Sequence, residues 1–69
     1  MITKIGIVAG EIWHFLDQRN QVSLSELLKN IEQPRDMILM SLGWLAREGH
    51  VVLRVLEDDH IISLRRGNR

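Results

Sequence analysis

Hydrophobic residues recur every three to four positions between residues 4 and 18. Six of them share one side of a helical projection: Ile5, Val8, Ala9, Ile12, Phe15 and Leu16. This spacing predicts an amphipathic helix over 4–18. Asn20 is expected to end it, because asparagine tolerates the left-handed conformation that often follows a helix C-terminus.

A second helix is predicted to begin after Ser23. In the segment Ser23-Leu-Ser-Glu26 the serine hydroxyl can accept a hydrogen bond from the amide of Glu26, and the glutamate can return one to the amide of Ser23. Val22 and Leu27 flank this capping box at the spacing of a hydrophobic staple, and Val22 is expected in a short strand. Asn30 is the predicted stop, so this helix has only about two turns.

A third helix is predicted from Pro34 to Gly49. Proline suits the first helical position because its φ is fixed near the helical value and its missing N–H is not needed there, whereas Gln33 is a poor N-cap. Four residues line the inner face and three extend it to one side: Ile38, Ser41, Leu42 and Leu45, then Met37, Met40 and Trp44. The short second helix and the turn before Pro34 are typical of a helix-turn-helix.

The hydrophobic period changes after Gly49. Residues 51–56 and 60–64 are β-branched runs that flank three consecutive carboxylates. This pattern predicts a β-hairpin with an acidic tip, entered directly from the third helix. We expect a single domain over residues 1–66, followed by a flexible C-terminal tail at 67–69.

Composition limits what so short a chain can do. Its 69 residues include no cysteine, which excludes disulfides and thiolate metal sites. A core of this size rarely contributes more than about 3 to 5 kcal/mol, so well-packed helices or association with another chain must stabilise it. Nine basic residues balance nine acidic ones, whereas proteins that grip DNA through its phosphates are usually basic. No apolar run is long enough for a membrane span and no secretion signal is visible, so a cytoplasmic location without membrane contact is expected.

The helix-to-hairpin junction carries a family resemblance. The run Leu42-Gly-Trp-Leu-Ala-Arg-Glu-Gly49, with residues 5–13 upstream and Val22-Ser-Leu-Ser-Glu-Leu27 between, resembles a small prokaryotic winged helix-turn-helix family long catalogued as a domain of unknown function. The match covers nearly the whole chain. It implies a mainly α fold with a small β-hairpin (α+β), in which three helices carry a β-wing. DNA binding follows from it only by analogy with the wider superfamily, because a fold does not assign a function.

In such a fold the outer face of the third helix would meet DNA. Six residues lie opposite its inner face: Arg35, Asp36, Leu39, Met40, Gly43 and Arg47. The two arginines suit phosphates, Leu39 and Met40 could face thymine methyl groups, and Arg65 and Arg66 could add non-specific contacts. The carboxylates at 57–59 would be repelled by a phosphate backbone. The resemblance therefore implies a non-enzymatic, transcription-regulator-like domain that associates with nucleic acid, and the residues predict that its contact with DNA is weak or non-specific.

The alternative is a protein-interaction or homodimerisation module that does not bind DNA. The candidate contact residues are Gly6, Ile7, Gly10, His14, Gly43 and Trp44. A glycine costs about 0.5 to 1 kcal/mol of helix stability relative to alanine, so the pair on the first helix needs a reason. Close packing within the monomer or a contact with a second copy would each supply one. Trp44 is either part of the core or an anchor for a partner.

Catalytic and metal-binding patterns are missing from the sequence. The three histidines are not paired at ligand spacing, the serines have structural explanations, and no glycine-rich phosphate loop follows a strand. A chain this small also has little room for a substrate cleft. We therefore expect a non-enzymatic domain with no cofactor, no metal and no small-molecule substrate.

Overall fold

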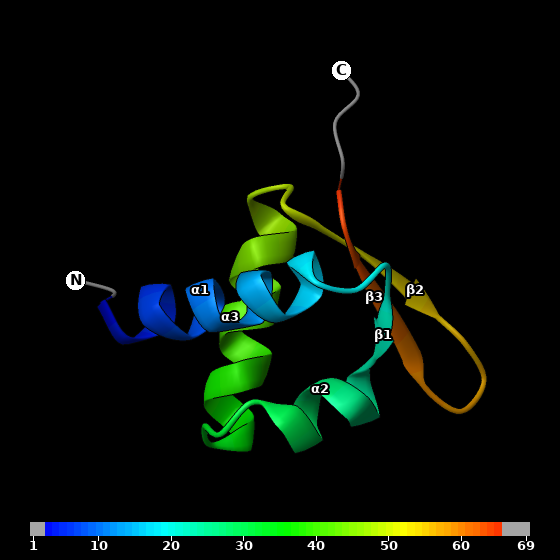
Figure 1. The fold of residues 1–69 in the computed structure, drawn as a ribbon, viewed down its shortest axis with the longest axis horizontal. Coiled ribbons are helices and arrows are strands. Elements are labelled where there is room, and N and C mark those ends of the chain that lie inside the picture. The colour runs from blue at the N-terminus through cyan, green and yellow to red at the C-terminus, as the bar shows by residue number, and fades with distance from the viewer. Residues whose placement is uncertain (1–2, 66–69) are drawn as a thin grey trace.

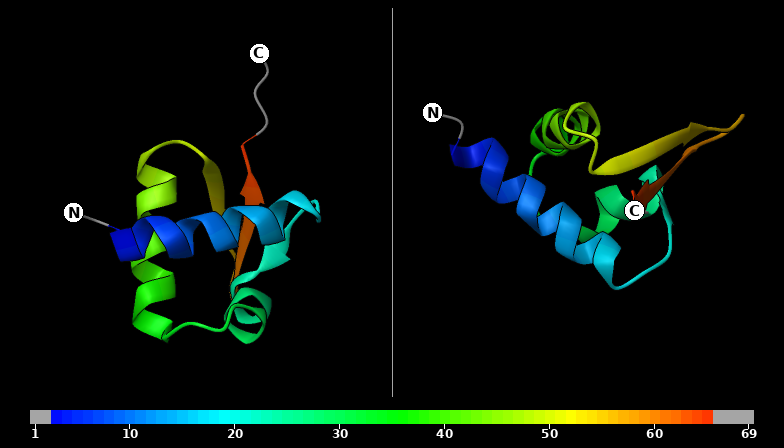
Figure 2. Two further views of the ribbon diagram at one scale, coloured as in Figure 1. Left: turned by 60° about the vertical axis from the view of Figure 1, so that its left-hand side comes forward. Right: turned by 90° about the horizontal axis from the view of Figure 1, so that it is seen from above.

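A computed structural model describes residues 3–65 as three helices and three strands (Figure 1). In chain order they are α1 (Thr3–Asp17), β1 (Val22–Ser23), α2 (Leu24–Asn30), α3 (Arg35–Arg47), β2 (Val51–Val55) and β3 (His60–Leu64). The helices pack together, and the β2–β3 hairpin extends away from them (Figures 1 and 2). The predicted fold, three helices with a β-wing, is confirmed. Arg66 and the tail predicted at 67–69 lie outside the described residues.

The strands form one antiparallel sheet in the order β1-β3-β2. The central strand β3 pairs Ile62 with Val22 of β1 on one side and with Leu53 of β2 on the other. The short strand at Val22 thus ties the start of α2 to the hairpin. β2 is an edge strand, paired on one side only within the described sheet.

The boundaries of α2 follow the predicted pattern in part. The Ser23 hydroxyl accepts a hydrogen bond from the amide of Glu26 at 3.1 Å. α2 ends at Asn30 after about two turns, as predicted. The expected left-handed conformation is wrong, because in the described part of the chain no residue other than glycine has a positive φ, so neither Asn20 nor Asn30 adopts it. Asn30 instead donates from its side-chain amide to the carbonyl of Glu26 at 2.8 Å, and the chain leaves α2 through an extended Ile31.

Both ends of α3 are set by backbone geometry. Pro34 precedes the helix instead of occupying its first position, since its ψ of 145° is extended, and no side chain caps the helix there. At the other end Gly49 has a φ of 81°, a conformation that glycine adopts without strain. The amide of His50 then donates to the carbonyl of Leu45 at 2.9 Å. This compact helix end sends the chain directly into β2.

The core lies where α1 crosses α3 (Figure 2) and where both meet the sheet. The four residues predicted for the inner face of α3 are all buried, and α1 buries four of its six: Ile38, Ser41, Leu42 and Leu45; Val8, Ala9, Ile12 and Leu16. Ile5 and Phe15 are only half-buried. All three aromatic residues of the chain, Phe15 and the two tryptophans, lie outside the buried set, so the core is aliphatic and aromatic surface remains near α1.

Candidate functional site

The outer face of α3 is the surface that a DNA-binding winged helix presents to the major groove. All six residues predicted to lie on it are exposed: Arg35, Asp36, Leu39, Met40, Gly43 and Arg47. The two arginines stand at the ends of the helix, about 18 Å apart along its axis. Between them the surface is aliphatic, since Leu39 and Met40 are 38% and 49% exposed. This face offers a duplex two separated cations and no amide side chain for reading bases.

An apolar groove of about 310 Å³ runs between α3 and the hairpin, and we call it the wing-side groove. Its lining residues are Leu24, Leu39, Leu42, Gly43, Leu53, His60 and Ile62. None of them is a lysine, an arginine or a carboxylate. A Cβ atom added to Gly43 would meet no heavy atom within 4 Å. Packing inside the chain therefore does not require this glycine, and its effect is to leave the groove open.

The hairpin carries aliphatic side chains beyond the core. Val51 at its base is buried, whereas Leu53, Val55 and Leu56 are 41%, 75% and 47% exposed. Side chains alternate along a strand, so Val51, Leu53 and Val55 share one face, and Leu53 shows that this face lines the wing-side groove. An apolar strip therefore continues from the core through the groove toward the hairpin tip.

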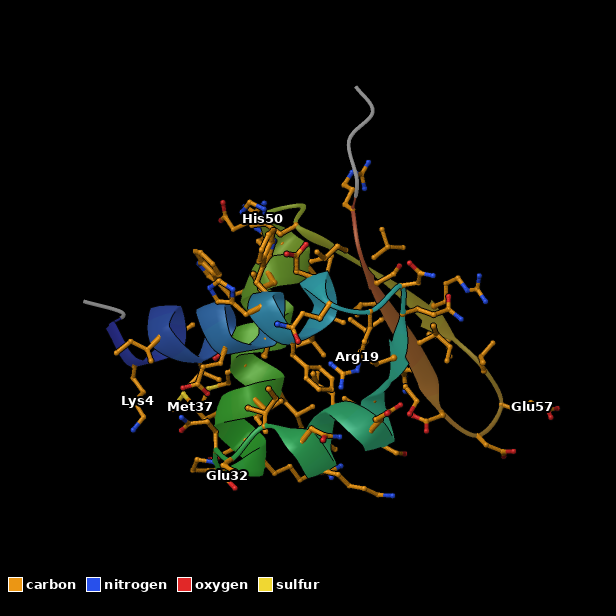
Figure 3. All side chains as sticks on the ribbon, viewed as in Figure 1. Lys4, Arg19, Glu32, Met37, His50 and Glu57 are labelled. Atoms are coloured by element: carbon orange, nitrogen blue, oxygen red, sulfur yellow. The ribbon has the colours of Figure 1, made fainter. Side chains whose placement is uncertain are left out.

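The three carboxylates at the tip differ in their surroundings: Asp59 is held by hydrogen bonds, whereas Glu57 and Asp58 are exposed. The Asp59 carboxylate accepts a hydrogen bond from the Ser25 hydroxyl of α2 at 2.6 Å and one from the amide of His60 at 2.8 Å. These bonds, the one from Ser25 above all, hold the pKa of Asp59 below its ordinary value. Glu57 and Asp58 are exposed, and Figure 3 shows Glu57 at the far end of the hairpin, away from the helices. The acidic surface of the tip is made by these two.

A second hollow, of about 250 Å³, lies on the opposite flank of α3 against α1, and we call it the α1-side hollow. Its lining residues are Gly6, Ala9, Gly10, Trp13, Trp44, Leu45 and His50. No heavy atom lies within 4 Å of the Cβ position of Gly6 or Gly10, so close packing within the monomer does not explain these glycines. Trp44 packs against the core, and its ring centroid lies 6.4 Å from that of His50. Both tryptophans of the chain thus border this hollow.

The residues predicted for protein contacts do not form one surface. Gly6, Gly10 and Trp44 come together at the α1-side hollow, whereas Gly43 lines the wing-side groove. The other two, Ile7 and His14, are exposed on α1 and line neither hollow. The prediction from the glycine pattern therefore assigned residues of two distinct surfaces to a single interface.

The hairpin side of the wing-side groove was not predicted from the sequence. Leu53 and Val55 were assigned to the hairpin but not to a site. The signal was the alternation in Val51-Val-Leu-Arg-Val55, whose core-facing positions remain apolar toward the tip. Such a strand extends an apolar face beyond the helices that bury its base.

Arg65, one of the two terminal arginines predicted to add non-specific DNA contacts, lies at the base of the wing. The amide of Arg65 donates to the carbonyl of His50 at 2.9 Å, and the side chain is exposed. Because Val51 pairs with Leu64 at this end of the hairpin, Arg65 lies at the opposite end from the acidic tip. Arg66 lies outside the described residues.

The described part of the chain, residues 3–65, holds no group of three or more histidine, aspartate or glutamate residues that could bind a metal ion. None of its helices combines the length and the hydropathy that a membrane crossing needs. A further hollow of about 530 Å³ is lined by the consecutive residues 17–21 after α1. It is a bend in one segment and not a site built from several elements.

Comparison with known proteins adds a family to this geometry. Residues 1–64 match the family model described as "Winged helix-turn-helix domain (DUF2582)", a domain of unknown function. One relative, the uncharacterized protein MJ1608 of Methanocaldococcus jannaschii, is 34% identical over 58 residues, which cover 81% of this chain and 80% of the relative. No solved structure matches the chain. The resemblance carried by the junction at residues 42–49 is confirmed: the chain belongs to the DUF2582 family of winged helix-turn-helix domains.

Proposed function

We propose that this winged helix-turn-helix domain is a protein-interaction module that binds through the wing-side groove and does not read DNA. The apolar lining of that groove is the observation that carries the proposal. A DNA-reading domain needs cations and hydrogen-bonding side chains on the surface that meets the duplex, which in a winged helix is formed by the recognition helix and the wing. Here leucines, an isoleucine, a glycine and one histidine line the groove between these two elements.

Exposed aliphatic side chains support a protein contact. Five of the seven large hydrophobic residues exposed in the described chain belong to α3 and the hairpin: Leu39, Met40, Leu53, Val55 and Leu56. Single exposed apolar residues are normal, but contiguous ones rimmed by polar groups mark interaction sites. Burying this strip against a partner would also enlarge the small apolar core of a short chain.

DNA binding remains the second candidate function, and one observation favours it. Arg35 and Arg47 are both exposed on the outer face of α3, where each could contact a phosphate. With only two such contacts, the binding constant for DNA would fall with about the second power of the salt concentration. Glu57 and Asp58 at the wing tip oppose even this, because they would be repelled by the phosphate backbone.

An NMR titration separates the two functions. We expect generic duplex DNA at low salt to leave the amide signals of α3 and the hairpin unchanged. An apolar probe, 1-anilinonaphthalene-8-sulfonate, should instead shift the amides of Leu39, Gly43 and Leu53 at protein concentrations that keep the chain monomeric, because the groove between these residues is then open and apolar.

The opposite pattern would overturn the proposal. It would consist of shifts along α3 and the hairpin that follow DNA addition, disappear with salt and weaken in an Arg35→Ala/Arg47→Ala variant. Lys4→Ala/Lys29→Ala is the matched control, since it removes two exposed cations from α1 and α2.

A further inference from the structure

We infer that the partner at the wing-side groove is a second copy of this chain, placed so that the wing tip of each protomer lies on α3 of the other. This inference rests on the proposed function, because it names the occupant of the same groove. Its support comes from the distribution of charge, the apolar strip and the dimensions of the two elements.

Charge on this surface is complementary to itself. Glu57 and Asp58 are exposed at the end of the hairpin. The outer face of α3 exposes Arg35 and Arg47 together with Asp36, so its net charge is positive by one. Within one protomer the hairpin extends away from α3, which keeps the tip and the helix apart (Figures 1 and 2). A two-fold axis can bring the acidic tip of each copy to one end of the other's α3, where one of the two arginines is exposed. Both contacts are then the same, as a closed dimer interface requires.

The apolar strip supplies the centre of this interface. Val55, at 75% exposure, lies next to the tip, and Leu39 and Gly43 line the helical wall of the groove. In the two-fold arrangement Val55 of one copy approaches Leu39 of the other. Gly43 leaves room for the incoming side chain, because nothing within 4 Å occupies its Cβ position. An apolar centre with a charged rim is the usual anatomy of a specific protein interface.

The dimensions also fit. The five residues of β2 span about 17 Å, and the thirteen residues of α3 span about 20 Å, so the hairpin of one copy can cover most of the other's α3. A stable interface buries about 800 Å² of each partner, which is about one sixth of the 4733 Å² surface of this chain. A face made of one long helix and a projecting hairpin can provide that share.

Charge-reversed variants test the arrangement by sedimentation equilibrium. The tip-reversed variant E57R/D58R and the α3-reversed variant R35E/R47E each bring like charges together at both contacts of a homodimer. We expect each variant alone to dissociate at least about 10-fold more readily than the wild type. Mixed in equal amounts, they restore two opposite-charge contacts and should form heterodimers of nearly wild-type affinity. Such restoration also shows that both variants are folded.

The control variant E11R/E32R makes the same change in net charge as the tip-reversed variant, at exposed carboxylates of α1 and the loop before α3. It should dimerise like the wild type. A wild-type protein that stays monomeric at millimolar concentration overturns the inference, and so does a dimer that neither groove variant weakens. Neither result decides the proposed function, which fails separately if duplex DNA shifts the α3 amides.

Discussion

The wing-side groove and the α1-side hollow flank the same helix, and glycines that no neighbour inside the chain requires keep both of them open. Their surroundings differ. The α1-side hollow lies between two packed helices and is bordered by tryptophans, one of them half-buried and the other 36% exposed. The wing-side groove is continued by a hairpin whose aliphatic residues leave the core, and charged residues stand at its ends. An apolar hollow alone is thus a weak sign of a binding site, and continuity with exposed apolar surface and complementary charge is a stronger one.

The largest expected difference between the two surfaces comes from placing a carboxylate on each. Leu39→Glu puts a charge into the wing-side groove, where association would desolvate it, so we expect the dissociation constant of the dimer to rise about 100-fold. Ile7→Glu is the matched control: its side chain is 55% exposed on α1, and its substitution should leave association unchanged. Sedimentation equilibrium measures both. Dissociation by Ile7→Glu but not by Leu39→Glu would make α1 the interface and reverse the comparison.

Filling the hollows gives a smaller and more selective effect. Gly43→Met and Gly10→Met each replace a helical glycine with a good helix former in open space, so both should raise the free energy of unfolding of the protomer by about 0.5 to 1 kcal/mol. Only Gly43→Met should weaken association, by roughly 10-fold, because its side chain fills the groove that the partner enters. Urea unfolding in dilute solution and sedimentation separate the two quantities. Equal weakening by both variants would mean that the two hollows belong to one interface.

The helices and strands were predictable because the spacing of their hydrophobic residues follows which side of each element faces the core. The inner face of α3 and the exposed residues opposite it were both predicted correctly, and Ser23 caps α2 as expected. The predicted end of α2 at Asn30 is confirmed, but the left-handed conformation expected there is wrong. Ile31 is 8% exposed and extended, so packing and not a left-handed turn ends that helix.

The site was less predictable, because it depends on which elements lie beside one another. Sequence spacing placed Gly10 and Gly43 in one class, but α1 borders the first hollow and the hairpin borders the second. The role of Asp59 was equally hidden, because its hydrogen-bond partner Ser25 lies 34 residues away in the chain. Charge at the tip was visible in the sequence, whereas its division into one structural and two exposed carboxylates was not.

The smallest expected effect concerns the hydrogen bond between Ser25 and Asp59, which joins the tip end of the hairpin to α2. This bond lies on the side of the wing-side groove, and neither residue lines the α1-side hollow. The pKa of Asp59 is lowered in the folded chain from the ordinary 3.8, first by Ser25 and then by the amide of His60. Ionisation of Asp59 therefore favours the folded state above the ordinary pKa, and this contribution is lost as the pH falls through the folded pKa. Ser25→Ala removes the larger cause, so the pKa of Asp59 should rise toward its ordinary value.

Carboxyl-carbon NMR across the acidic range follows the titration of Asp59 in the wild type and in Ser25→Ala, with urea unfolding at the same pH values. Ser63→Ala, a half-buried serine of β3, is the control and should leave the titration unchanged. If Ser25→Ala also left the pKa of Asp59 unchanged, the amide of His60 alone would account for its lowering. The hairpin tip would then be held by its own turn and not by α2. In that case the wall of the wing-side groove would be positioned by the sheet pairing of β2 with β3, and the α2 contact would no longer distinguish this groove from the α1-side hollow.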